Sequence, residues 1–167
     1  MSEKNAAPKV DGEFLNPFIG AAKTTLETQA NIQITPSKAF IKKNTDDYPT
    51  SIEIAGIINL TCQQFSGSIA LCFNSETFFK IYESMLDETP QELNEEVSDC
   101  AGELLNIIFG TAKTALQTKG YKLERAIPTV LIGEKLKVQF RSKYPAIVLP
   151  FESSAGNFFI EILVDPD

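Results

Sequence analysis

The sequence contains no histidine and no tryptophan, and it has only three cysteines. Without histidine the chain lacks the commonest general base and imidazole metal ligands, and phosphohistidine chemistry is excluded as well. The cysteines, Cys62, Cys72 and Cys100, are odd in number, lie in apolar stretches and lack metal-type spacing, which favours buried free thiols in a reducing compartment. A nucleophilic cysteine would need an activating base that histidine cannot supply, so thiol catalysis is not expected.

Basic residues are also scarce. The chain has 15 lysines and arginines against 22 aspartates and glutamates, which gives a formal charge of -7 and an isoelectric point near 4.7. This balance argues against a nucleic acid or an acidic membrane as the partner, because phosphate groups require clustered lysine and arginine. The acidity suits a partner with a basic face, although many cytosolic domains are acidic for solubility alone.

Long apolar runs are missing too. No stretch of about twenty apolar residues is available to span a membrane. Residues 1–12 are polar and lack the apolar region of a secretory signal. We therefore expect a cytoplasmic protein without a membrane-spanning segment.

A repeated segment organises the chain. Residues 12–28 (GEFLNPFIGAAKTTLET) align without gaps with residues 102–118 (GELLNIIFGTAKTALQT), and Gly, Glu, Leu, Asn, Gly, Ala, Lys, Thr, Leu and Thr recur in register. The chain of 167 residues suits one domain. We predict a single domain over 1–167, with a flexible tail at 1–10 and two related halves, 11–90 and 91–167, that share one core.

Each half is expected to contain a long helix followed by strands. Apolar residues at helical spacing predict helices in both copies of the repeat, the second running from about 95 to 118, and a further helix over 75–86 with Ser75 as its N-cap. Strand character is found at 32–34, 39–42, 51–62, 66–73, 122–132, 135–141, 146–151 and 158–164. This order predicts an α+β fold, a two-layer domain with long helices packed on a mostly antiparallel sheet.

One face of the second long helix is polar. At 100° per residue, one arc of this helix holds Asp99, Glu103, Asn106, Gly110, Lys113, Thr114 and Gln117. Asn and Gly are poor residues inside a helix, so their presence on an exposed stripe indicates a role other than helix stability, and Gly110 would let another protein approach closely. Such a stripe is nevertheless most often a solvated face, and duplication copies residues whether or not they matter. From the residues alone, a solvated face, a binding face and an active site remain open.

Glu103 and Asn106 suit a particular chemistry, because they are neighbours at i and i+3. An asparagine amide both donates and accepts hydrogen bonds and can orient a water molecule, which matters in phosphoryl transfer, where catalysis rests mainly on positioning. A glutamate can pair with a partner's lysine. The pair suits the hydrolysis of a phosphate whose metal and labile bond another protein supplies.

These residues also carry a resemblance. The pattern Asp99-x3-Glu103-x2-Asn106-x21-Pro128 resembles the signature of the CheC/CheX/FliY chemotaxis phosphatases, and the segment from Glu13 to Ile19 resembles the first helix of CheX-type members. The resemblance implies a phosphatase that dephosphorylates a CheY-like response regulator, with Asn106 orienting the attacking water and Glu103 forming a salt bridge to a lysine of the regulator.

The resemblance implies further properties. Asp99 and Pro128 would have supporting roles, in the polarity of the helix face and the shape of the adjoining loop. Mg²⁺ would be bound by the receiver, so this chain would bind no cofactor. A homodimer would form through sheet edges, and 158–164 (FFIEILV), which carries few charges, is one segment capable of forming such an edge.

The first copy of the motif departs from the family pattern. Lys9 and Lys38 stand where the signature has an acid or serine and a proline. Pro17 favours a first-turn position, which would make Asn16 the N-cap and put Glu13 before the helix. Glu13 and Asn16 are therefore interpreted as a relic of duplication, with a second site as the alternative.

Two other functions remain possible at this stage. One is a non-catalytic module that binds response regulators or flagellar switch proteins through the same stripe. The other is a structural domain whose polar stripe is only solvated.

Overall fold

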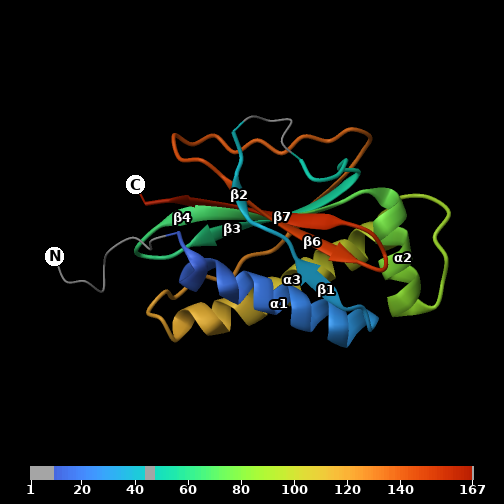
Figure 1. Cartoon of the computed structure of the whole chain (residues 1–167), viewed down its shortest axis with the longest axis horizontal. Coiled ribbons are helices and arrows are strands. Elements are labelled where there is room, and N and C mark those ends of the chain that lie inside the picture. Colours follow the sequence, from blue (N-terminus) through green and yellow to red (C-terminus); the bar gives the residue numbers. More distant parts are fainter. Residues whose placement is uncertain (1–9, 44–47, 167) are drawn as a thin grey trace.

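The computed structural model describes residues 10–43 and 48–166. The predicted tail lies outside the described residues except for Val10. Figure 1 shows α1 and α3 side by side across one face of a sheet, α2 at one end, and irregular segments over the opposite face. The elements, in chain order, are α1 (Gly12–Ala30), β1 (Ile34–Pro36), β2 (Phe40–Ile41), β3 (Ile54–Thr61), β4 (Ser66–Phe73), α2 (Ser75–Leu86), α3 (Glu95–Gln117), β5 (Thr129–Ile132), β6 (Ile147–Ser153) and β7 (Phe158–Asp165).

Both halves of the chain contribute strands to the same sheet. The strand order is β1-β6-β7-β4-β3-β5, with β2 also pairing with β6, and all of these pairs are antiparallel. The predicted α+β class is confirmed. β7 lies between β6 and β4, so its apolar run reflects a strand covered on both faces, and it is not the sheet edge that its few charges suggested.

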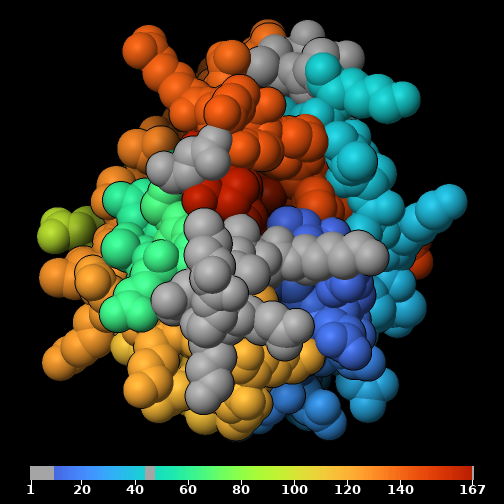
Figure 2. All heavy atoms as spheres, turned by 90° about the vertical axis from the view of Figure 1, so that its left-hand side faces the viewer, coloured from blue at the N-terminus to red at the C-terminus, as the bar shows by residue number. Residues whose placement is uncertain are grey.

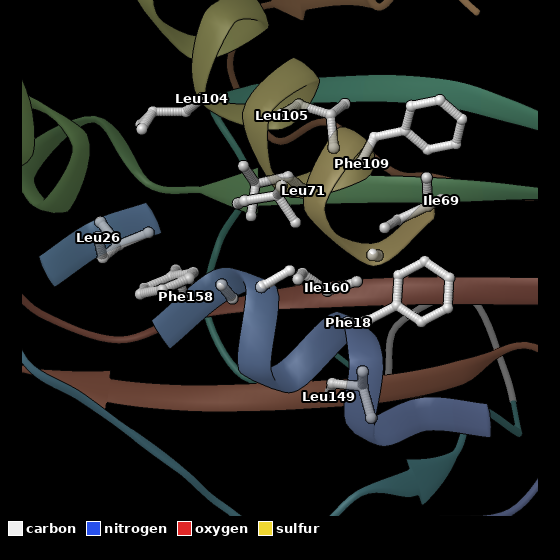
Figure 3. Close-up of a cluster of buried hydrophobic side chains, with 14 of the residues drawn as sticks. Phe18, Leu26, Ile69, Leu71, Leu104, Leu105, Phe109, Leu149, Phe158 and Ile160 are labelled. Carbon is white, nitrogen blue, oxygen red and sulfur yellow. The ribbon is translucent and has the colours of Figure 1, made fainter. Parts of the chain in front are cut away.

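Most of the core lies between the helices and the sheet. Figure 3 shows labelled side chains from α1, α3, β4, β6 and β7 meeting there. A second, smaller cluster lies on the other face of the sheet, where loops rather than helices cover it. The labelled residues of the main core are Phe18, Leu26, Ile69, Leu71, Leu104, Leu105, Phe109, Leu149, Phe158 and Ile160.

The start of α1 differs from the prediction. Asp11, not Asn16, is the N-cap, and its side chain accepts hydrogen bonds from the amides of Glu13 (3.1 Å) and Phe14 (3.3 Å). Asn16 and Pro17 therefore both lie inside the helix. The aspartate is the stronger cap here because its carboxylate also carries a charge that suits the positive end of the helix dipole.

A contact from the other half of the chain accommodates Pro17 within α1. Proline has no N–H to donate to the carbonyl four residues earlier, which is that of Glu13. Lys119, just beyond α3, donates to this carbonyl oxygen at 2.8 Å instead. The start of α1 and the end of α3 lie side by side at one end of the molecule (Figures 1 and 2), so the acceptor left by the proline is satisfied.

Two predicted strands of the second half are largely irregular. Of 122–132 only Thr129–Ile132 pairs with a neighbour, β3, while 135–141 forms no strand. The second segment instead crosses the loop-covered face, with single backbone bonds such as Leu136 N to Ile52 O at 2.9 Å. The first-half strands predicted at 32–34 and 39–42 are short, at 34–36 and 40–41.

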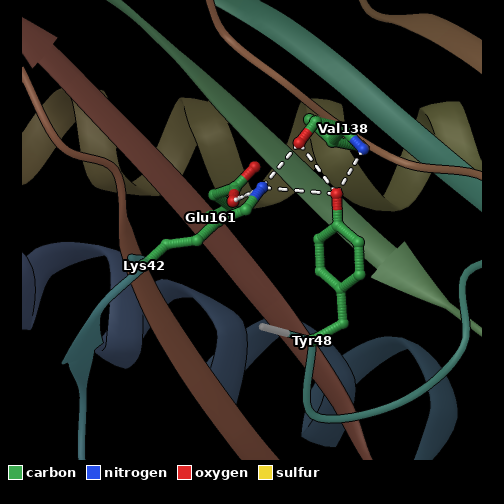
Figure 4. A network of polar contacts seen from close by, with 4 residues as sticks. All are labelled: Lys42, Tyr48, Val138 and Glu161. Carbon is green, nitrogen blue, oxygen red and sulfur yellow. Dashed lines mark hydrogen bonds and ion pairs between the residues drawn. The ribbon is translucent and has the colours of Figure 1, made fainter. Parts of the chain in front are cut away.

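A buried polar cluster links the irregular segment 135–141 to the sheet (Figure 4). The Lys42 ammonium lies 2.6 Å from Oε1 of Glu161, on β7, and donates to the Val138 carbonyl at 2.6 Å. The Tyr48 hydroxyl donates to the same carbonyl at 2.8 Å and accepts from the Val138 amide at 2.5 Å. The cluster thus joins three segments that are distant in sequence.

Candidate functional site

The polar stripe predicted for the second long helix is exposed on α3. Asn94 is the N-cap, and its side-chain oxygen accepts a hydrogen bond from the Val97 amide at 3.0 Å. The apolar residues of α3 face the sheet and α1, which leaves the polar residues on the outer side. The exposed residues of the stripe are Asp99, Glu103, Asn106, Gly110, Thr114 and Gln117, and Lys113 is half-buried.

The outer side of α3 forms one side of a groove of about 1100 Å³. The other side is formed by residues 125–128, which we call the rim segment, and by Val130 of β5. The structure thus brings Pro128 into the same groove as the α3 residues, although 21 residues separate it from Asn106 in the sequence. The predicted site residues that line the groove are Asp99, Glu103, Asn106, Gly110 and Pro128.

A buried glycine sets the spacing between the two sides of the groove. A Cβ on Gly102 would lie 3.3 Å from Cγ2 of Val130 and 3.8 Å from Cγ of Pro128. The chain after α3 can therefore pack directly on the helix at this point. Upstream, the amide of Glu124 donates to the carbonyl of Thr61 at 2.8 Å and attaches the segment to β3. The groove is held at both ends of the rim segment.

Three residues of the rim segment were missed by the sequence reasoning, which placed them in a strand. Arg125, Ala126 and Ile127 line the groove as irregular chain. The available signal was Pro128, because a proline restricts the preceding residue to extended conformations and does not favour a position in the middle of a strand. Ile127 departs most from the predicted strand, because its apolar side chain is 90% exposed.

The first copy of the motif lies on another part of the surface. Glu13 and Asn16 are exposed on α1 and are spaced i and i+3 within one helix, as Glu103 and Asn106 are on α3. The prediction that Glu13 precedes the helix is therefore wrong. Neither residue lines the α3 groove.

The cysteines take no part in the groove. All three are free; Cys72 and Cys100 are buried and Cys62 is half-buried. Burial raises the pKa of Cys100 to about 11, with a further contribution from the charge of Glu103, and burial likewise raises the pKa of Cys72. Both thiols therefore stay protonated and unreactive at neutral pH.

Within 10–43 and 48–166, no group of three or more acidic or thiol side chains could hold a metal ion. In the same part of the chain, no helix is both long and apolar enough to cross a membrane.

The fold and groove define a class: an α+β domain in which a long helix presents an exposed Glu–Asn pair beside an antiparallel sheet. The solved chemotaxis protein CheX from Vibrio vulnificus has the same architecture, with a TM-score of 0.84 and 35% identity over 92% of this chain and 99% of that one. Residues 54–152 match the family model described as chemotaxis phosphatase CheX. The chain belongs to this family, as its signature predicted.

Two further relatives add detail about the family. The CheY-P phosphatase CheX of Thermotoga maritima is 24% identical over 131 residues, which cover 78% of this chain and 82% of the relative. CheX of Borrelia burgdorferi, solved as a complex with CheY, BeF3 and Mg²⁺, shares the fold with a TM-score of 0.76 and 22% identity over 94% of this chain and 99% of that one.

Proposed function

We propose that the protein hydrolyses the aspartyl phosphate of a CheY-like response regulator in chemotaxis signalling. The observation that carries the proposal is the exposed pair Glu103 and Asn106 in a groove that a partner can enter. The groove offers no histidine and no metal-binding cluster among the described residues, which suits a chain that completes the active site of another protein. The names of the Thermotoga and Borrelia relatives support the choice of substrate.

Asn106 has the central role in the proposed reaction. Its amide oxygen accepts a hydrogen bond from water and its NH2 group donates to the forming phosphate, which places the water in line with the bond that breaks. The water oxygen bonds to phosphorus, the bond to the aspartyl oxygen breaks, and the products are inorganic phosphate and a free carboxylate. Mg²⁺ held by the receiver would supply the positive charge that stabilises the transferred phosphoryl group. Glu103 pairs with a lysine of the receiver and fixes the pose.

The direct test is phosphate release from a phosphorylated receiver of the same cell. Added protein should accelerate the loss of phosphate. Glu103→Lys should lower kcat/KM by about 100-fold, because it sets like charges against each other at the interface. The matched control is Glu13→Lys, on the equivalent exposed position of α1, which should act like the parent.

The same experiment separates the proposal from its rival. A binding module for receivers or flagellar switch proteins would lose binding in Glu103→Lys. The parent protein would nevertheless fail to accelerate phosphate release from any receiver tested. A solvated stripe would tolerate the substitution in every assay. Either result would contradict the phosphatase proposal.

Gly110 allows a second prediction with an internal control. Gly110 and Gly20 occupy equivalent positions on α3 and α1, and a Cβ on either would meet nothing within 4 Å. Each Gly→Ala change should raise the free energy of unfolding by up to about 1 kcal/mol, since alanine is the better helix former. Only Gly110→Ala adds an atom inside the groove, so it alone should lower kcat/KM, by about 10-fold. Urea unfolding and phosphate release measure the two effects; equal activity of both variants would show that no partner approaches α3 at Gly110.

The remaining parts of the proposal concern the surroundings of the reaction. We propose that the chain acts in the cytoplasm, where its receiver would be phosphorylated, and that it forms a homodimer through a sheet edge. Among the residues that the structure describes, β5 pairs on one side only, with β3, and Leu131 (46%) and Ile132 (39%) are exposed. Sedimentation of the parent and of a Leu131→Lys variant tests the dimer.

A further inference from the structure

The rim segment presents an apolar side chain to solvent next to the proposed reaction centre. Ile127 is 90% exposed, whereas its neighbours Ala126 and Pro128 are half-buried, and Ala126 packs against the main core. A singly exposed isoleucine is common on protein surfaces and needs no explanation by itself. Ile127 differs because it borders the groove that contains Asn106.

Ile127 is also held in place before any partner binds. Pro128 restricts the backbone of Ile127 to extended conformations. The proline packs against α3 at Gly102, where a Cβ would lie 3.8 Å from its Cγ. The bond from the Glu124 amide to Thr61 fixes the other end. A side chain whose backbone is already ordered loses less conformational entropy on binding. More of the free energy gained by burying it therefore appears as affinity.

The charges in the groove are separated along α3. Asp99 and Glu103 lie toward the N-terminal end of the helix, and Lys113 lies toward its C-terminal end, with Asn106 between them. Arg125 adds a second cation from the rim segment. An aspartyl phosphate with the carboxylates that hold its Mg²⁺ is strongly acidic, and a lysine beside it is basic. The groove thus offers a complement to both charges of such a partner.

We propose that the rim segment is the second docking surface for the phosphorylated receiver, with Ile127 as an apolar anchor and Arg125, together with Lys113, as the cations that attract the acidic phosphorylation site. This inference rests on the proposed function and names the residues that select the partner. Ile127 and Arg125 act in binding and orientation, and Asn106 remains the group that touches the reacting water.

The anchor is tested by Ile127→Ser, with Ile41→Ser as the control. Ile41 is 55% exposed on β2, far from the groove residues in the sheet order. Loss of an apolar side chain that becomes buried on binding should raise KM by about 10-fold to 100-fold while kcat changes little. Ile41→Ser should leave both constants unchanged.

The cation is tested by Arg125→Glu, with Arg141→Glu as the control, since both arginines are exposed. Charge reversal at a docking surface acts mainly on association, so Arg125→Glu should lower kcat/KM by about 10-fold at low salt. The difference from the parent should shrink in about 0.5 M salt, where screening is strong. Arg141→Glu should match the parent at both salt concentrations.

Binding of a receiver loaded with BeF3 and Mg²⁺ is measured in parallel for all four variants. If Asn106→Ala abolishes acceleration while Ile127→Ser and Ile41→Ser share one KM, the proposed function stands and the docking inference fails. If the parent accelerates nothing, the binding assay still tests the rim segment, with tighter binding by Ile41→Ser than by Ile127→Ser as the supporting result. If Ile127→Ser changes the sedimentation of the protein but not its affinity for the receiver, the segment is an interface between copies and the inference is overturned.

Discussion

Asn106→Ala should slow the accelerated release of phosphate by about 100-fold to 1000-fold, the effect of removing one positioned hydrogen-bonding group from a reaction centre. The loss should fall on kcat, because Asn106 is proposed to act on the attacking water rather than on the affinity of the receiver. The fold should tolerate the change. Asn106 is exposed, and alanine is a better helix former, so the free energy of unfolding should rise by several tenths of a kcal/mol.

The repeat supplies the control for this experiment. Asn16 has the same spacing from Glu13 on α1 and is also exposed, but it does not line the groove. Asn16→Ala should therefore retain the activity of the parent. A parent-like rate for Asn106→Ala would sink the mechanism. If α1 were a second working site, each variant alone would lose only about half of the accelerated rate.

The sequence predicted the α3 side of the site because a helix face follows from spacing alone. Residues at i, i+3 and i+7 must lie on one side of a helix, so Glu103, Asn106 and Gly110 could be grouped before any tertiary structure was known. The α+β class followed in the same way from the alternation of helical and strand patterns. Both inferences depend only on residues that are close in the sequence.

The start of α1 could not be predicted in this way. Asp11 and Asn16 are both good caps, and Pro17 favoured the second, because a proline is usually confined to the first turn. The structure reverses this preference through Lys119, which satisfies the Glu13 carbonyl that the proline leaves without a donor. That contact joins residues 106 positions apart, and no local pattern reveals it.

The rim segment was missed for a similar reason. The apolar residues of 122–132 suit a strand, but only 129–132 pairs with β3, while Glu124 makes a separate backbone bond to Thr61 at the far end of that strand. The residues before 129 cross the open side of α3 instead. Whether such an apolar segment becomes a strand depends on its tertiary contacts, here the packing of Pro128 against α3 at Gly102, rather than on its own pattern.

The buried pair of Lys42 and Glu161 should have the largest effect on stability. Glu161 is fully buried on the central strand β7, and the Lys42 side chain is 8% exposed. Within 10–43 and 48–166, no group donates a hydrogen bond to Oε2 of Glu161. Lys42→Met would remove the one cation that pairs with this carboxylate in that part of the chain. We expect the free energy of unfolding to fall by about 3 to 5 kcal/mol at neutral pH.

The pH dependence of this loss has a definite sign. Burial raises the pKa of Glu161, and Lys42 offsets this only in part. Without the lysine the pKa should rise further, so the folded protein holds a proton that the unfolded chain releases. Such a group destabilises the fold increasingly as pH rises through the interval between the two pKa values. Lys42→Met should therefore regain stability in acid, as measured by urea unfolding at several pH values.

In the parent, the charge of Lys42 affects stability at the opposite, alkaline end of the pH scale. Burial lowers its pKa, but the hydrogen bonds and charges of Glu161 and Tyr48 outweigh burial and raise it. Its contribution to stability is therefore fully present below its ordinary pKa of 10.5 and is lost as pH rises from that value through the raised pKa of the folded protein.

The double variant Lys42→Met/Glu161→Leu distinguishes two causes of the instability of Lys42→Met: the unpaired Glu161 carboxylate, and the lost contact of Lys42 with the Val138 carbonyl. Two apolar side chains of similar size can replace a buried ion pair with little loss, so the double variant should recover most of the stability that Lys42→Met loses. Any remaining loss in the free energy of unfolding would measure the hydrogen bond from Lys42 to the Val138 carbonyl, which links the irregular segment 135–141 to the sheet. If the double variant is as unstable as Lys42→Met, the uncompensated carboxylate is not the cause, and the lysine acts through that loop contact.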